Sequence, residues 1–239
     1  MRLDKFLSHT GFGSRKEVKE LLKKKRVQVN QVLVKDGKWA INELEDKVTV
    51  DGNQVIYQKY VYYLLNKPKG VVSATEDAEH RTVIDLIAKD DYVPGLFPIG
   101  RLDKDTTGLL LLTNDGDLAH QLLSPKKKIM KSYLAEIVGQ MTSEDVKAFQ
   151  AGMILKNGDV CLPAELLILE SQSMPERTLA KISIVEGKYH QVKRMVAAVG
   201  KKVVELDRVS MAGLKLDDSL ARGQYRPLTE FELRQIGAI

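Results

Sequence analysis

The sequence is poor in the residues that build disulfide scaffolds, metal centres and aromatic clusters. It has one cysteine, one tryptophan and four histidines among 239 residues, and aromatic residues make up 6% of the chain. A single cysteine excludes a disulfide framework and a zinc site built from several cysteines. The histidines include no pair at helical spacing that could hold a metal ion. We therefore expect Cys161 to be a small packed residue.

Long apolar runs and nucleotide-binding signatures are missing as well. No stretch of about 18 apolar residues occurs, so the sequence predicts no transmembrane helix. The opening residues, MRLDK, alternate apolar and charged side chains and lack the apolar core of a signal peptide. Neither a GxGxxG fingerprint nor a P-loop is present. These absences predict a cytoplasmic protein with no membrane partner.

Positive charge is concentrated at the N-terminal end. The net charge is +5, and residues 1–60 hold 13 basic and 8 acidic residues whereas the remainder holds 24 of each. The whole excess lies in the first quarter, which predicts an appended module that binds a polyanion. We assign this module to residues 1–58, with the polar segment after Asp51-Gly52 as a linker, and a large domain to residues 59–239.

The N-terminal module is predicted to contain two helices and three short strands. Ser14 and Glu17 form a capping box at the start of the second helix, and a hairpin is expected around Asn30-Gln31. Few aromatic side chains are available to stack on bases, so this module should recognise backbone and shape more than sequence. We favour a phosphate-binding surface over a merely solvated helix end, with these candidate residues: Arg15, Lys16, Lys19, Lys23 and Lys24.

The large domain mixes strands and helices without a regular strand–helix–strand repeat. This arrangement is typical of an α+β fold with a largely antiparallel sheet. The predicted strands include residues 61–65, 109–112, 133–138, 179–184 and 202–209, and the predicted helices include 117–123, 143–151 and 189–199.

The segment GRLDKDTTGLLLLTNDG, residues 100–116, places charged residues directly before a buried strand. On an extended segment, residues two apart share a face, so Arg101 and Asp103 should project together, with Asp105 beyond them. An arginine beside an aspartate favours the ionised carboxylate, which can act as a nucleophile. An ion pair that only organises a turn explains the pattern equally well.

The longer pattern resembles the catalytic motif of the pseudouridine synthases, in the branch that modifies single sites in bacterial ribosomal RNA. Four more segments are similar in the same order: YYLLNKPKGVVSA, KSYLAEI, VEGKYHQVKRMVAAVGKKVVELDRVSMAGLKL and GQYRPLTEFEL. Residues 1–37 resemble the small RNA-binding domain first described in ribosomal protein S-four, with Gln31 in place of the usual glycine. GKYHQVKRM and the C-terminal ending are most similar to the RsuA-type group, which acts on uridine 516 of 16S rRNA.

This resemblance implies an isomerisation and assigns roles to particular residues. The N1–C1′ bond of a flipped-out uridine breaks, the base turns, and it rejoins through C5, so no cofactor is required. Asp103 is the implied nucleophile, Tyr133 stacks on the base, and Lys193 pairs with Asp103. Contacts to the nucleotide or its RNA are implied for a second set: Arg101, which fills the vacated position, Val192, which forms an apolar wall, and Arg194. By pattern alone, Tyr133 fits a core aromatic, and Lys193 and Arg194 fit solvated helix residues.

The implied partner is 16S rRNA, in a partly assembled small subunit, bound by a monomer. Three alternatives stay open. The target could be a 23S rRNA site, which the motifs do not exclude. A non-catalytic rRNA-binding assembly factor is disfavoured by the intact Asp103, Tyr133 and Lys193. Glycoside hydrolysis would need Asp103 and Asp105 on opposite sides of a sugar, which their spacing disfavours.

Overall fold

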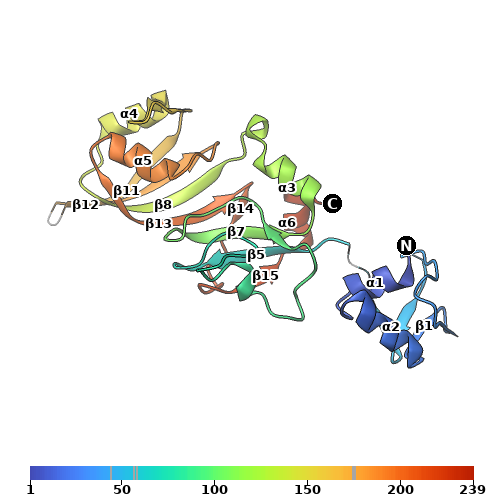
Figure 1. Ribbon diagram of the computed structural model, residues 1–239. Helices are drawn as coiled ribbons and strands as arrows, with labels where there is room; N and C mark the ends of the chain where they lie inside the picture. The colour runs from blue at the N-terminus through green and yellow to red at the C-terminus, as the bar shows by residue number, and fades with distance from the viewer. Residues whose placement is uncertain (44, 56, 58, 174–175) are drawn as a thin grey trace. The chain divides into compact units, whose positions relative to one another are not determined.

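The computed structural model describes residues 1–43, 45–55, 57, 59–173 and 176–239. It divides into two compact units, drawn as ribbons in Figure 1: Met1–Val61 with Ile87–Leu96, and Tyr62–Leu86 with Phe97–Ile239. The chain thus passes from one unit to the other close to the expected linker. Independent folding of residues 1–58 stays a prediction.

The first unit packs two helices on a small antiparallel sheet. The capping box is present, because Ser14 accepts from the Glu17 backbone and Glu17 reaches back to Ser14. One prediction was wrong: the polar segment after Gly52 is not simply a linker, because its first residues pair with the preceding strand as a fourth strand. The elements are α1 Leu3–His9, α2 Arg15–Lys23 and, in sheet order, β2 Val32–Leu33, β1 Val27–Val29, β3 Val48–Val50 and β4 Asn53–Val55.

The predicted hairpin joins β1 to β2 through a two-residue turn. Asn30 and Gln31 have φ values of 50° and 67°, and Val29 pairs with Val32 across the turn. Two successive left-handed residues match the twist of the flanking strands. Gln31 therefore occupies a conformation that favours glycine, at a cost of about 1 kcal/mol.

The second unit is built on one mixed, mainly antiparallel sheet, which confirms the predicted α+β class. The strand order is β11-β12-β8-β13-β7-β5-β15, and among the pairs of strands named in the described residues only β13–β7 is parallel. The strands are β5 Tyr62–Lys67, β6 Phe97–Pro98, β7 Thr107–Thr113, β8 Lys131–Val138, β11 Glu165–Ser173, β12 Glu176–Ile184, β13 Lys202–Met211, β14 Leu214–Lys215 and β15 Tyr225–Pro227; β9 Met153–Ile154 and β10 Val160–Cys161 form a separate pair.

Helices lie towards both ends of this sheet (Figure 1). Leu118 and Leu122 of α3 share a core with Leu109 and Leu111 of β7, which explains why the leucine run is buried. Near the other end, α4 contacts β11 and α5 contacts β13. The helices are α3 Gly116–Leu123, α4 Ser143–Ala151, α5 Gln191–Ala198 and α6 Glu230–Gln235, with 3-10 turns at Ile84–Leu86 and Pro125–Lys127.

Helix α5 begins two residues later than predicted. His190 precedes it with a φ of 49°, a left-handed conformation that cannot continue a helix backwards. The turn separates Tyr189 and His190 from the helix. No helix in the described part of the chain has the length and apolar character needed to cross a membrane.

A glycine permits the parallel contact at the centre of the sheet. Gly108 has a φ of 102°, and a Cβ atom there would lie 2.3 Å from the backbone oxygen of Arg208. Only glycine tolerates both the angle and the close approach. The contact fixes the start of β7, and with it the GRLD segment, against β13.

Candidate active site

The GRLD segment borders a cavity of about 370 Å³ in the second unit. This volume lies at the lower end of the range for small-ligand pockets and suits one nucleoside. The sequence brings distant segments together here, because the lining includes the loop before β7, β8, the turn before α5 and β13. Among the lining residues are Arg101, Asp103, Thr106, Lys131, Tyr133, His190, Val192 and Arg208.

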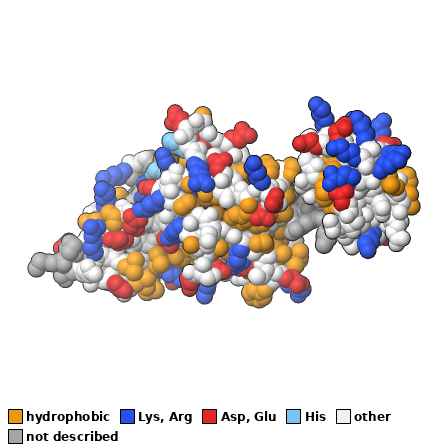
Figure 2. All heavy atoms as spheres, turned by 90° about the horizontal axis from the view of Figure 1, so that it is seen from below, with side chains coloured by type: hydrophobic (Ala, Val, Ile, Leu, Met, Phe, Trp, Pro, Cys, Tyr) orange, Lys and Arg blue, Asp and Glu red, His pale blue; other side chains and the backbone are white. Residues whose placement is uncertain are grey.

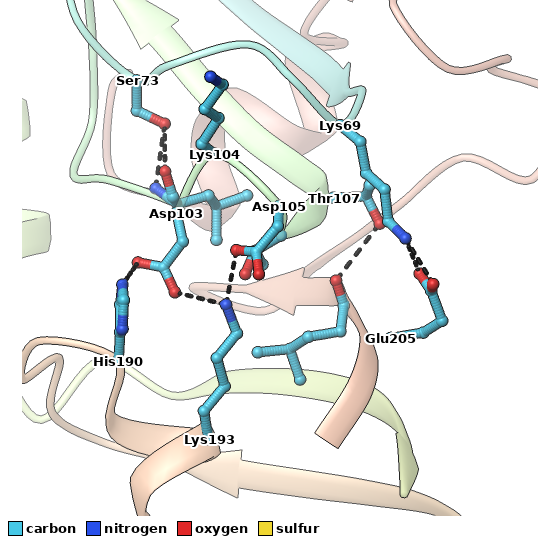
Figure 3. A network of polar contacts seen from close by, with 12 residues as sticks. Lys69, Ser73, Asp103, Lys104, Asp105, Thr107, His190, Lys193 and Glu205 are labelled. Carbon is cyan, nitrogen blue, oxygen red and sulfur yellow. Dashed lines mark hydrogen bonds and ion pairs between the residues drawn. The ribbon is translucent and has the colours of Figure 1, made fainter. Parts of the chain in front are cut away.

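The carboxylate of Asp103 lies between the side chains of Lys193 and His190. Its Oδ2 atom lies 3.1 Å from Nζ of Lys193, and its Oδ1 atom lies 3.4 Å from Nε2 of His190. Figure 3 shows the carboxylate pointing at both partners. The Lys193–Asp103 pair implied by the resemblance is therefore present. The carboxylate is 28% exposed, so it is held firmly and remains accessible from the cavity.

Lys193 also binds Asp105, at 2.6 Å. Burial opposes the charge on Lys193, but the hydrogen bonds that its ammonium donates to Asp105 and Asp103 outweigh burial and raise the pKa of Lys193. The hydrogen bond from Lys193 in turn lowers the pKa of Asp105. Both carboxylates thus bind one ammonium group, which joins them directly. The lysine occupies the place between the two carboxylates that a sugar would need in paired-carboxylate glycoside hydrolysis, which disfavours that reaction.

Arg101 and Asp103 both line the cavity, as their expected shared face predicts, but no ion pair joins them in the described residues. Arg101 is exposed and borders the cavity, and in the described residues it has no carboxylate partner. The segment does not stay extended either, because it turns at Lys104 and Asp105 before β7 begins. The ion-pair partner of Asp103 is therefore Lys193, which lies 90 residues away in the sequence, and not its near neighbour Arg101.

The remaining predicted site residues fall into two groups. Tyr133 on β8 and Val192 on α5 are 8% and 3% exposed and both line the cavity. Arg194, expected to contact RNA, does not line it. Its guanidinium instead binds Asp159 at 2.7 Å and also Asn157. Successive residues of a helix point in different directions, so Arg194 cannot join Lys193.

Two residues that the sequence analysis missed bind the backbone of the loop that carries Asp103. Lys67 at the end of β5 is 0% exposed, and its Nζ donates to the backbone oxygens of Asp103 and Thr106, both at 2.9 Å. Ser73 binds the backbone of Leu102 through both a donated and an accepted hydrogen bond of 3.0 Å. Burial lowers the pKa of Lys67 to about 8.

Both supporting residues come from the segment YYLLNKPKGVVSA, in which the sequence predicts only a strand that ends at residue 65. The position of Lys67 at the end of an apolar strand is the sequence feature that could have indicated its buried role. Of its chain neighbours, Leu64 and Leu65 are fully buried, which predicts an interior position for residue 67 when the strand is flanked on both faces.

The described residues contain no group of three or more His, Cys, Asp or Glu side chains that could hold a metal ion. Cys161 is 2% exposed, and burial raises the pKa of its thiol. The interpretation of Cys161 as a packed residue is confirmed.

Family models identify the class of protein. Residues 61–198 match the model described as RNA pseudouridylate synthase, and residues 1–48 match the S4 domain. The class is that of enzymes that isomerise uridine to pseudouridine in RNA. The chain belongs to the RNA pseudouridylate synthase family and carries an S4 domain at its N-terminal end. It is therefore an enzyme, and not the non-catalytic assembly factor considered as an alternative.

Relatives along the whole chain agree with this assignment. An uncharacterized RNA pseudouridine synthase of Bacillus subtilis is 47% identical, covering 98% of this chain and 97% of its own. The ribosomal small subunit pseudouridine synthase A of Yersinia pestis is 41% identical (100% and 99%), and the ribosomal large subunit pseudouridine synthase B of Bacillus subtilis is 37% identical (100% and 96%). A crystal structure of a pseudouridylate synthase, 35% identical, superimposes with a TM-score of 0.67 over 99% of both chains.

Proposed function

We propose that this enzyme converts one uridine of ribosomal RNA, position 516 of the 16S rRNA, with Asp103 as the nucleophile. The observation that carries the proposal is the Asp103 carboxylate, held by Lys193 and His190 at a cavity of nucleoside size. A carboxylate fixed in this way attacks without first losing rotational freedom. The rigid strand and the buried Lys67 explain why charged residues stand directly against a buried strand.

The surrounding residues support the same reaction. Lys193 balances the charge of Asp103 until the nucleotide enters. Tyr133 provides an aromatic face for the base, and Val192 provides an apolar wall. Arg101, exposed at the border of the cavity and without a carboxylate partner in the described residues, is free to contact the displaced nucleotide.

The S4 domain binds the RNA around the target uridine. Flipping a base out of structured RNA costs a few kcal/mol, which phosphate contacts elsewhere can offset. All five predicted basic residues of this module are exposed, and Figure 2 shows many lysine and arginine side chains on it. Lys23 pairs with Glu20 at 2.7 Å, whereas four have no ion-pair partner in the part of the chain described: Arg15, Lys16, Lys19 and Lys24.

Removing the lysines at the end of α2 should weaken RNA binding without changing the target. In the triple variant Lys23→Gln, Lys24→Gln and Lys25→Gln, the slope of log affinity against log salt should decrease by about 0.7 to 0.9 per lost phosphate contact, up to three contacts. Filter binding at several salt concentrations measures this slope. The modified position should stay the same, because the catalytic cavity and the RNA fold select the uridine. An unchanged slope would contradict the role of these lysines.

The choice of the small subunit rests on the segments at residues 185–216 and 223–233 and on relatives named for that subunit. A second target is favoured by one observation, the similarity to a large subunit synthase along the whole chain. We propose action in the cytoplasm, by a monomer, on a partly assembled small subunit.

Deleting the gene and mapping pseudouridine in both rRNAs tests the target. We expect uridine 516 of the 16S rRNA to lose its modification and to regain it when the gene is restored. Loss of a 23S pseudouridine with position 516 unchanged would assign the enzyme to the large subunit instead.

A further inference from the structure

Two residues that line this cavity each carry a buried polar atom without a hydrogen-bond partner in the described residues. Among the side chains that the structure describes, three residues have such an orphaned atom: Thr106, Arg177 and Arg208. Thr106 and Arg208 both line the cavity beside Asp103 and are each 2% exposed. Buried polar groups are nearly always satisfied, so two exceptions among the residues of one cavity indicate hydrogen-bonding capacity available to a ligand.

The register of the sheet explains why Arg208 reaches this position. Arg208 on β13 is paired with Tyr133 on β8, so both side chains lie on one face of the sheet. Lys131 lies two residues before Tyr133 and shares that face. All three line the cavity, with Arg208 and Tyr133 nearly inaccessible to solvent.

Arg208 keeps an unbalanced charge in the interior. Its Nε donates to the backbone oxygen of Leu109 at 2.8 Å, its Nη2 has no partner, and no carboxylate pairs with it in the described parts of the chain. Burial lowers the pKa of Lys131, and the charge of Arg208 lowers it further. Burying a guanidinium without a counter-charge is costly, which points to a ligand that supplies acceptor oxygens.

We propose that Arg208 and Thr106 bind the uracil ring inside the cavity and that Arg208 stabilises the negative charge on the ring when it detaches. Uracil presents two carbonyl oxygens around one N–H group, which suits a guanidinium donor and a hydroxyl that donates or accepts. The phosphates of the nucleotide continue into the RNA chain outside, whereas the base is the part that enters deepest. The buried guanidinium therefore meets the base. This assignment rests on the proposed role of Asp103.

The charge on the ring follows from the balance of the reaction. When the N1–C1′ bond breaks, its electron pair leaves with the uracil, whose charge spreads over N1 and the carbonyl oxygens, while the Asp103 carboxylate bonds to C1′. The ring then supplies an electron pair from C5 to form the C5–C1′ bond, which displaces the Asp103 carboxylate from C1′. C5 loses its proton, and N1 gains one. No oxidant or reductant is needed. A donor fixed at a carbonyl oxygen binds the detached ring more strongly than the neutral base.

The test compares Arg208→Met and Thr106→Val with a control, Lys202→Met, which removes an exposed charge from the start of β13. Conversion of RNA by Arg208→Met should fall about 100-fold in kcat, and by Thr106→Val about 10-fold, with RNA affinity unchanged. Lys202→Met should convert RNA at the normal rate. Because apolar replacement of a buried unpaired charge is often neutral or stabilising, Arg208→Met should unfold at the same denaturant concentration or higher.

Binding of free uracil, 5-fluorouracil and uridine monophosphate, followed by NMR titration, identifies the group that Arg208 contacts. Wild-type protein should prefer 5-fluorouracil, whose ring is more acidic, and Arg208→Met should lose that preference. If only uridine monophosphate binding weakened, Arg208 would bind phosphate and the proposal would be wrong. Unchanged kcat and uracil binding in both variants would also overturn it, even where Asp103→Asn is inactive. An active Asp103→Asn enzyme would instead overturn the proposed nucleophile.

Discussion

Replacing Asp103 by asparagine should abolish pseudouridine formation while the protein stays folded and binds RNA. Asparagine keeps the shape of the side chain but cannot act as a nucleophile, so the rate should fall about 10⁴-fold or more. The lost ion pairs should cost less than about 1 kcal/mol of unfolding free energy, since the Asp103 side chain is 28% exposed and Lys193 retains Asp105. Release of the C5 hydrogen from labelled uridine in RNA measures the rate.

Asp105→Asn is the matched control for this experiment. Asp105 contacts the same ammonium group at 2.6 Å, but its side chain is 72% exposed, and it is absent from the cavity lining. Its replacement should therefore reduce the rate much less than that of Asp103. Comparable losses of rate in the two variants would mean that Asp103 and Asp105 both serve to position Lys193, and that Asp103 is not the nucleophile. Full activity of Asp103→Asn would exclude it as the nucleophile.

Local sequence patterns predicted most of the fold, because the spacing of apolar residues indicates which side chains are buried. The apolar run that became β7 and the capping box that starts α2 were both found from the sequence, and α4 has the predicted bounds. The fourth strand of the first unit was missed because Asn53–Val55 is polar and partly exposed. Backbone hydrogen bonds to β3 hold these residues in a strand, and the polar composition of the segment does not predict that pairing.

The site was predictable where a motif marks the residue and not where tertiary contacts decide its partner. The resemblance pointed to Asp103, Tyr133 and Lys193. The structure places Asp103 and Tyr133 in the lining of one cavity and pairs Lys193 with Asp103. It gave no signal for His190, because the contact with Asp103 depends on a left-handed residue before α5. Lone basic residues are normally solvated, so the residue type of Lys67 does not indicate that it is buried.

Replacing Lys67 by methionine should lower kcat about 100-fold and leave RNA affinity unchanged. Methionine fills the space but leaves the backbone oxygens of Asp103 and Thr106 without their donor at 2.9 Å. A displacement of about 1 Å at a reacting group commonly costs a factor of this size. Lys69→Met is the control, since Lys69 is exposed and pairs with Glu205, and it should retain its rate to within about twofold.

The pH dependence distinguishes this positioning role from a general loss of stability. The pKa of Lys67 is about 8 in the folded protein against 10.5 for an ordinary lysine. Between these values the unfolded chain binds more protons, so the contribution of Lys67 to the free energy of unfolding increases with pH. Activity should nevertheless fall above pH 8, because the neutral amine has one donor fewer for the carbonyl oxygens of the loop. Pseudouridine formation and urea unfolding between pH 7 and pH 10 should therefore change in opposite directions in the wild type. Lys67→Met should lack the alkaline loss of activity, and a parallel decline of both quantities in the wild type would contradict the assignment.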